Sequence, residues 1–163
     1  MAITKSEGPP KQIKLAYTYA ELFSVVENIT NEIAVTILDG ESMPMIDEYG
    51  VSEDEKYTII QKMYDAANEI FERLMKITNG ITDSVLLETT GVECSIVDKA
   101  AYNQNVLEAI DRLIKNGLIN YIIKDWFIDK KQVDYAAIYD LKYKKNIKDI
   151  LKRSVQLRKP TIT

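Results

Sequence analysis

The sequence predicts a mainly α-helical protein, a bundle of four to five helices with a small β-hairpin or other β excursion and extended termini. Three observations carry this prediction. Apolar residues recur every three or four positions along most of the chain, which is the period of a helix face. A capping box marks the start of one helix, and a short stretch near 84–97 is rich in β-branched residues around a turn.

Residues 1–12 are polar and include Gly8-Pro9-Pro10, so we expect an extended N-terminal arm. The first helix is predicted from about Ile13 to Leu38, and Asp39-Gly40 supplies its stop. Its apolar face is formed by residues spaced three and four apart: Leu15, Tyr19, Leu22, Val26, Ile29, Ile33 and Ile37.

The loop 41–50 is unusually apolar for a connection, so we expect it to pack on something. A second helix begins after it at Ser52, because Ser52 and Glu55 have the spacing of a capping box. Three acidic residues in its first turn suit the positive end of the helix dipole. An apolar stripe then continues to Asn79-Gly80, where we expect the helix to end: Ile60, Met63, Ala67, Ile70, Leu74 and Ile77.

The stretch 84–97 has β-branched residues on both sides of Thr89-Thr90-Gly91, which predicts a small hairpin or packed excursion. An isolated two-stranded ribbon is marginal in water. A neighbouring chain could therefore extend it by adding a strand.

The C-terminal third is predicted to be helical. One helix should run from about Asn103 to Asn116, where Asn116-Gly117 is a stop signal. A separate buried helix should cover 118–127, because its apolar pairs repeat every four residues. The last helix is predicted over about Gln132 to Gln156. Residues 13–155 then form one helical domain, followed by an extended tail at 156–163.

Composition argues against several classes of function. The chain has no His, which removes the commonest general base and the commonest metal ligand. Cys94 is the single cysteine, which fits a reducing compartment. Glycines are scattered, so no phosphate-binding loop is present, and no segment is apolar enough to span a membrane. We therefore expect a non-enzymatic protein with no catalytic residue, cofactor, metal or membrane partner.

Charge is divided along the chain. Residues 1–110 hold 8 Lys/Arg and 19 Asp/Glu, a net charge of −11, whereas residues 111–163 hold 13 Lys/Arg and 6 Asp/Glu, a net charge of +7. A surface that is acidic in one part and basic in another can pair head-to-tail with copies of itself. This division is the strongest functional signal in the sequence.

Three groups of residues are the candidate subunit interface. The basic donor is Lys144, Lys145, Lys148, Lys152, Arg153, Arg158 and Lys159. The aromatic group is Trp126, Tyr135, Tyr139 and Tyr143, three of which share a helix face at i, i+4 and i+8. The acidic acceptor is Asp65, Glu69 and Glu72. The alternatives are a solvated Lys-rich helix face, phosphate contacts with nucleic acid, and a tyrosine stripe that packs inside the monomer.

The order of the C-terminal segments resembles a known family. Over about residues 103–163, a helix ending in Tyr121-Ile122-Ile123-Lys124-Asp125-Trp126-Phe127 precedes a Tyr-rich basic helix and an Arg158-Lys159-Pro160 tail. This looks like the head–tail connector or neck ring proteins of tailed bacteriophages, including crAss-like and other Bacteroidetes phages. The resemblance implies a helical subunit of a cyclic ring beneath the portal, with arm 1–12 and tail 156–163 clasping neighbours.

The expected function is thus a structural subunit of a phage virion, assembled in the host cytoplasm as a homo-oligomeric ring in the portal–tail connector. Its expected partners are copies of itself, the portal and other neck or tail proteins, with possible non-specific contact with packaged DNA. The alternative is a cytoplasmic helical adaptor or regulator that binds nucleic acid. A carboxylate-based metalloenzyme is a third reading.

Overall fold

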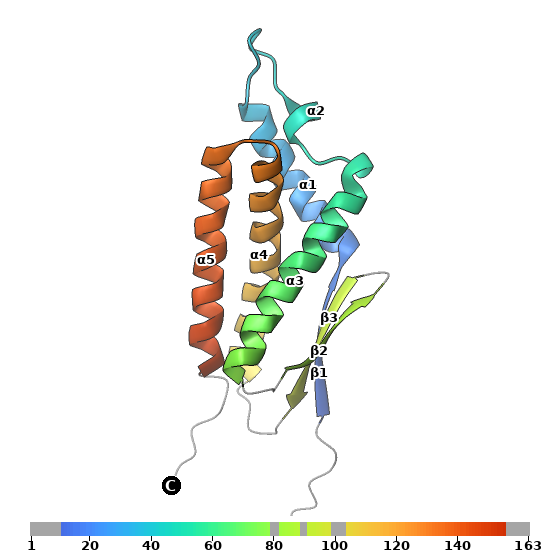
Figure 1. The fold of residues 1–163 in the computed structure, drawn as a ribbon, viewed down its shortest axis with the longest axis vertical. Helices are drawn as coiled ribbons and strands as arrows, with labels where there is room; N and C mark the ends of the chain where they lie inside the picture. The colour runs from blue at the N-terminus through green and yellow to red at the C-terminus, as the bar shows by residue number, and fades with distance from the viewer. Residues whose placement is uncertain (1–10, 79–81, 89–90, 99–103, 156–163) are drawn as a thin grey trace, which may run out of the picture.

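The computed structural model describes residues 11–78, 82–88, 91–98 and 104–155. This part of the chain is mainly helical with a small antiparallel sheet, as the sequence predicts (Figure 1). The elements in chain order are β1 (Lys11–Thr18), α1 (Tyr19–Thr36), α2 (Ile46–Tyr49), a 3₁₀ turn (Glu53–Glu55), α3 (Lys56–Thr78), β2 (Thr82–Glu88), β3 (Gly91–Asp98), α4 (Gln104–Asp129) and α5 (Val133–Val155).

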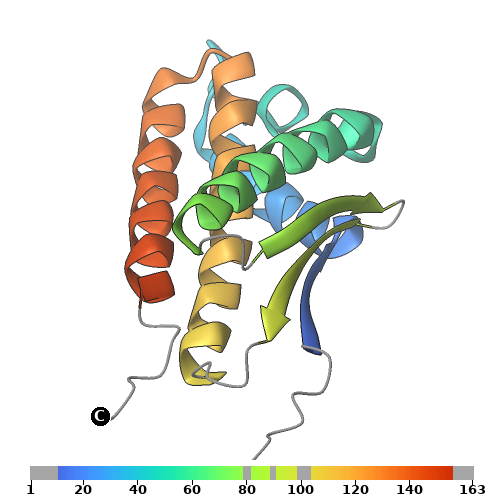
Figure 2. The same cartoon turned by 60° about the horizontal axis from the view of Figure 1, so that its bottom comes forward.

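Helices α4 and α5 lie side by side and antiparallel, joined by a tight turn in which Lys131 has a positive φ of 57° (Figures 1 and 2). Helix α3 crosses α4 obliquely, and the sheet lies on the far side of α3 from α5. Large side chains from three helices fill the space between these layers. The fully buried ones include Leu22 of α1, Phe71 of α3 and Phe127 of α4. Each removes apolar surface worth roughly 1.5–3 kcal/mol from water.

The first helix begins later than the sequence pattern suggested. Residues 11–18 form strand β1, in which Leu15 and Tyr17 are buried while Ala16 and Thr18 are exposed. This alternation has the period of a strand, and pairing with β3 satisfies the backbone. The Thr18 hydroxyl then caps α1 by accepting from the amide of Glu21 at 3.2 Å. The predicted start of the helix at Ile13 is therefore wrong. Lys11 and Gln12, which the sequence predicts as part of the arm 1–12, belong to β1. Residues 1–10 lie outside the described part.

The predicted hairpin over 84–97 is confirmed as strands β2 and β3. The sheet has the order β1-β3-β2, so the chain's own β1 supplies a third strand to the ribbon. Gly91 permits this close pairing, because a Cβ at that position would lie 2.2 Å from the carbonyl oxygen of Tyr17.

Helix α4 is continuous from Gln104 to Asp129, so the predicted break at Asn116-Gly117 is wrong. Gly117 is buried inside the helix, and a Cβ there would lie 3.2 Å from Cδ1 of Ile70 and 3.7 Å from Cβ of Asn146. The glycine therefore serves the close approach of α3 and α5 to α4 instead of ending the helix. Burial of the residues on both sides outweighs the intrinsic cost of a glycine in a helix, about 1 kcal/mol.

Two further predictions are confirmed. Ser52 and Glu55 form the capping box before α3, in which the Glu55 carboxylate accepts from the amide of Ser52 at 2.8 Å. The last helix runs over Val133–Val155, within one residue of the predicted bounds. Within the described residues, no helix is both long and apolar enough to cross a membrane.

Candidate assembly surfaces

The basic donor residues that the structure describes lie on the solvent side of α5. Lys144, Lys145, Lys148, Lys152 and Arg153 are all exposed. Lys144 forms an ion pair of 2.7 Å with Asp140 one turn earlier, and exposed pairs of this kind contribute little to stability. Arg158 and Lys159 lie outside the described residues. The placement suits both a docking surface and a solvated helix face.

The aromatic group lies mostly inside the monomer. Trp126, Tyr139 and Tyr143 are 2%, 8% and 4% exposed, and Tyr135 is half-buried. The i, i+4, i+8 stripe packs α5 on α4, with the Tyr121 and Tyr143 rings edge to face at 5.3 Å. These three residues agree with the alternative of a stripe that packs inside the monomer, because the nearest apolar surface for the stripe is the chain's own α4. Their part in a subunit interface stays a prediction.

The acidic acceptor residues lie along α3, and one of them is engaged by α5. The Glu69 carboxylate accepts from the Tyr143 hydroxyl at 2.8 Å and from Arg73 at 3.3 Å. Asp65 is exposed and accepts from the side-chain amide of Gln61 at 3.2 Å. Glu72 is exposed and takes part in a contact of its own. Glu69 thus holds two helices of one chain together, which the sequence reading did not foresee.

Burial and charge perturb the tyrosines between α3, α4 and α5. Burial raises the pKa of Tyr143, and the hydrogen bond to Glu69 and its negative charge raise it further. Burial, with the charge of Asp125 and other carboxylates, also raises the pKa of Tyr121. The Lys124 ammonium lies 4.0 Å from the Tyr121 ring centroid, a cation–π distance. These rings stay neutral at ordinary pH and act as packing groups.

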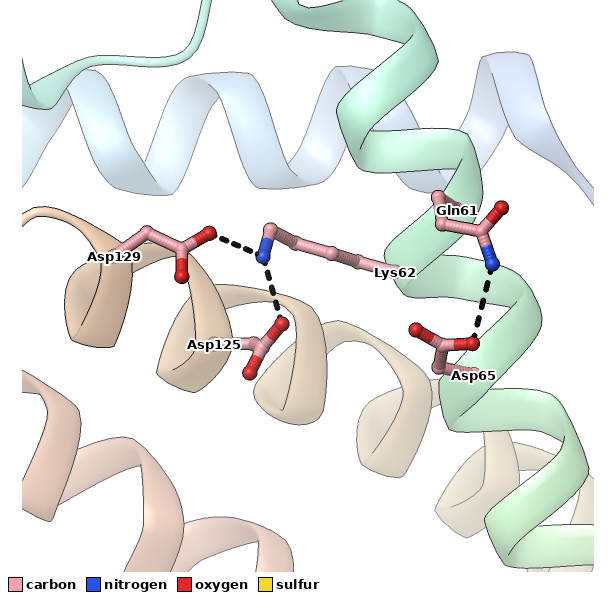
Figure 3. A network of polar contacts seen from close by, with 5 residues as sticks. All are labelled: Gln61, Lys62, Asp65, Asp125 and Asp129. Carbon is pink, nitrogen blue, oxygen red and sulfur yellow. Dashed lines mark hydrogen bonds and ion pairs between the residues drawn. The ribbon is translucent and has the colours of Figure 1, made fainter.

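A partly buried ion network joins α3 to α4 (Figure 3). The Lys62 ammonium extends from α3 and donates to Asp125 at 2.7 Å and to Asp129 at 2.6 Å. Burial lowers the pKa of Lys62, but hydrogen bonds and charge from the two aspartates outweigh it and hold that pKa above its usual value. The sequence carries a signal for this network, since Lys62 shares the helix face of the apolar residues Ile59 and Met63.

The apolar loop after α1 forms a projection that we call the tip, residues 38–48, at the top of Figure 1. Leu38, Met43 and Ile46 are 54%, 59% and 41% exposed there. The expectation that this loop packs is therefore not met by these side chains within the monomer. The tip carries only acidic charge, and all four of its carboxylates are exposed: Asp39, Glu41, Asp47 and Glu48.

A hollow that we call the basic cleft lies between the lower halves of α4 and α5 in Figure 1. It has a volume of about 580 Å³ and includes three cationic side chains and one carboxylate. Its lining is Ala109, Arg112, Leu113 and Asn116 from α4, with Asp149, Lys152 and Arg153 from α5. Sequence reasoning found the two α5 cations but missed Arg112, because the arginine lies on the preceding helix.

A third surface, the α5 outer face, combines exposed apolar and basic side chains. Ile138 and Leu141 are 47% and 68% exposed, and Lys145 and Lys148 continue the same side of the helix toward its C-terminus. Surfaces that expose large apolar side chains beside charge are typical of protein contacts.

No group of three or more His, Cys, Asp or Glu residues within the described ranges is arranged to hold a metal ion. The molecule therefore presents three surfaces of contrasting chemistry: the acidic apolar tip, the basic cleft and the α5 outer face. No protein-family model matches this sequence, and comparison with curated proteins and with solved structures finds no similar protein.

Proposed function

We propose that this protein is a non-enzymatic structural subunit that assembles with copies of itself into a ring, in the head-to-tail connector of a tailed bacteriophage. One observation supports the self-assembly most directly. The tip exposes apolar side chains among carboxylates, while the cleft and α5 outer face at other places on the molecule carry the cations. Different patches that complement each other form heterologous contacts, and these close into rings when the rotation allows.

The exposed apolar residues give this contact its source of free energy. Leu38 and Met43 on the tip are each more than half exposed. Their burial against a neighbour would remove apolar area from water at about 25 cal/mol per Å². The opposite charges would set orientation, speed encounter and add a part of the affinity that salt screens.

The virion assignment rests on the resemblance of residues 103–163 to neck ring proteins. In that setting the ring is assembled in the host cytoplasm and lies between the portal and the other neck or tail proteins. Lysines on the α5 outer face, such as Lys145 and Lys148, would face a neighbour or the phosphates of packaged DNA.

The test of self-assembly is the mass distribution of the purified protein by sedimentation velocity, in low and high salt. We expect a discrete oligomer at micromolar concentration that loses mass as salt screens the charges, and closed rings in negative-stain electron microscopy. A protein that stays monomeric under all these conditions, with and without a portal ring, would overturn the proposal.

The second candidate, a helical nucleic-acid-binding adaptor, is favoured by the convergence of Arg112, Lys152 and Arg153 on one cleft. A gel-shift titration against salt separates the two candidates. Phosphate binding predicts an affinity that falls steeply and linearly on a log–log plot as salt is raised. An assembly subunit predicts weak DNA binding and oligomers that form without nucleic acid.

A further inference from the structure

We propose that the tip of one copy docks in the basic cleft of the next copy. This inference rests on the proposed self-assembly and specifies the two surfaces that meet. The acidic tip and the basic cleft lie toward opposite ends of the helical body (Figure 1). One molecule therefore cannot bring its own tip into its own cleft, and the contact joins successive copies head to tail.

Internal hydrogen bonds hold the tip in a defined shape. The Asp39 carboxylate accepts from the amides of Glu41 at 2.8 Å and Met43 at 2.9 Å. The amide of Asp39 also donates to the carbonyl of Met43 at 2.9 Å. At the base of the tip, the Trp126 indole donates to the carbonyl of Tyr49 at 2.8 Å, which fixes α2 on α4. Such preorganisation reduces the conformational entropy lost on binding.

Asp39 is used in this internal turn, so the carboxylates of Glu41, Asp47 and Glu48 remain for a partner. Among the residues that the structure describes, none of these three forms an ion pair. The side chains of Met43 and Ile46 are exposed beside them. The tip thus offers an apolar knob surrounded by negative charge.

The cleft has the complementary chemistry. Arg112 and Arg153 are exposed, and neither forms an ion pair with another described residue. Arginine binds carboxylates through two parallel N–H donors, which suits Glu41 and Glu48 of a neighbour. Half-buried Leu113 gives the lining an apolar part that fits Met43. A hollow of about 580 Å³ admits several side chains, the size of a loop tip.

The α5 outer face is the competing receptor, and it fits less well. Its cations are lysines, which pair with carboxylates as point charges and not through a fixed fork. Lys144 beside it is already paired with Asp140. The outer face is also convex helix surface, whereas the tip projects and needs a hollow to bury its apolar side chains.

The test uses charge reversal on each side of the contact in the full chain. Arg112→Glu with Arg153→Glu reverses the cleft, and Glu41→Lys with Glu48→Lys reverses the tip. Each double variant should lower the association constant roughly tenfold or more by sedimentation velocity, because like charges then face each other. An equimolar mixture of the two variants should assemble again as alternating copies. The basic tip of the tip variant then meets the acidic cleft of the cleft variant, and the unmodified acidic tip of the cleft variant meets the unmodified basic cleft of the tip variant. Circular dichroism confirms that each variant is folded.

Lys56→Glu is the matched control, since it reverses an exposed cation at the start of α3, outside the three surfaces, and should leave assembly within about threefold of the unmodified protein. Lys145→Glu tests the competing α5 outer face, and docking in the cleft predicts that its effect on assembly is equally small. Zero-length carboxylate–amine cross-linking of mixed light and heavy-isotope protein should join Glu41 or Glu48 of one copy to Lys152 of another.

If the cleft variant assembles normally while Lys145→Glu does not, the docking proposal is overturned and self-assembly stands. Loss of DNA binding without loss of assembly in the cleft variant would also overturn it. A monomeric unmodified protein overturns both proposals.

Discussion

The Tyr143 hydroxyl donates a hydrogen bond of 2.8 Å to the carboxylate of Glu69, which joins α5 to α3. Tyr143 is buried and Glu69 is half-buried, so the bond is partly shielded from water. It gives an intramolecular role to two residues that the sequence predicts at a subunit interface. A subunit contact through α5 would therefore use other residues of this helix.

Tyr143→Phe tests this bond. The variant keeps the ring packing on Tyr121 and removes only the hydroxyl, so we expect a loss of about 1 kcal/mol in the free energy of unfolding. Urea denaturation measures it. Tyr57→Phe is the control, because Tyr57 is 87% exposed at the start of α3, and its loss should be near zero. Equal losses in both variants would mean that the bond does not stabilise the fold.

The Lys62 network gives a second prediction. Lys62→Met keeps the length of the side chain but leaves Asp125 and Asp129 without their cation. Since Asp129 is 55% exposed and can be hydrated, we expect a loss of about 1–3 kcal/mol, less than for a fully buried pair. Lys144→Met is the control, because its pair with Asp140 is exposed, and we expect about 0.5 kcal/mol or less. A stable Lys62→Met variant would show that apolar packing fully replaces the network.

Gly117 gives a third prediction. Its Cβ position faces Ile70 at 3.2 Å, and Ile70 is itself 1% exposed, so the side chain has little room to move. Gly117→Val should therefore lose about 1–3 kcal/mol through overpacking, despite the better helix propensity of valine. Gly40→Ala is the control, since nothing lies within 4 Å of that Cβ position. Unchanged urea midpoints in Gly117→Val would mean that α3 can move away from α4.

Most of the fold could be predicted because local signals agree with packing. The capping box at Ser52, the helical stripe of α3 and the β-branched residues of β2 and β3 each reflect short-range chemistry. The wrong predictions concern segments whose structure is decided by tertiary contacts and not by the local sequence. Residues 13–19 carry apolar side chains at every second position, but the helical spacing that continues through Leu22 concealed this strand signal. Gly117 reads locally as a stop, and only the helices packed against it make it an interior residue.

The site was less predictable, because it depends on which helices become neighbours. The exposed cations of α5 follow directly from their position opposite the buried stripe. Arg112 joins Lys152 and Arg153 only through the antiparallel pairing of α4 and α5. The sequence shows that the tip is apolar, but only the positions of the surrounding helices decide which of its side chains stay exposed.

The raised tyrosine and lysine pKa values predict that the fold weakens in alkali. Burial is the first cause for Tyr19, Tyr121, Tyr139 and Tyr143, whose pKa values all exceed the ordinary 10.0. The carboxylates of Asp125 and Asp129 likewise hold the pKa of Lys62 above its ordinary 10.5. Above about pH 10 the unfolded chain loses these protons while the native chain keeps them. The native state then binds more protons, so the free energy of unfolding falls as pH rises.

Urea denaturation at about pH 8 and about pH 11 should show this fall, and the fall should be smaller in Tyr143→Phe, which lacks one of the retained protons. Tyrosinate absorbance of the native protein gives an independent reading. Part of the signal from its 10 tyrosines should appear only as the fold is lost. If all of them ionise near pH 10 while circular dichroism is unchanged, the tyrosines between α3, α4 and α5 are more accessible to water than their burial indicates.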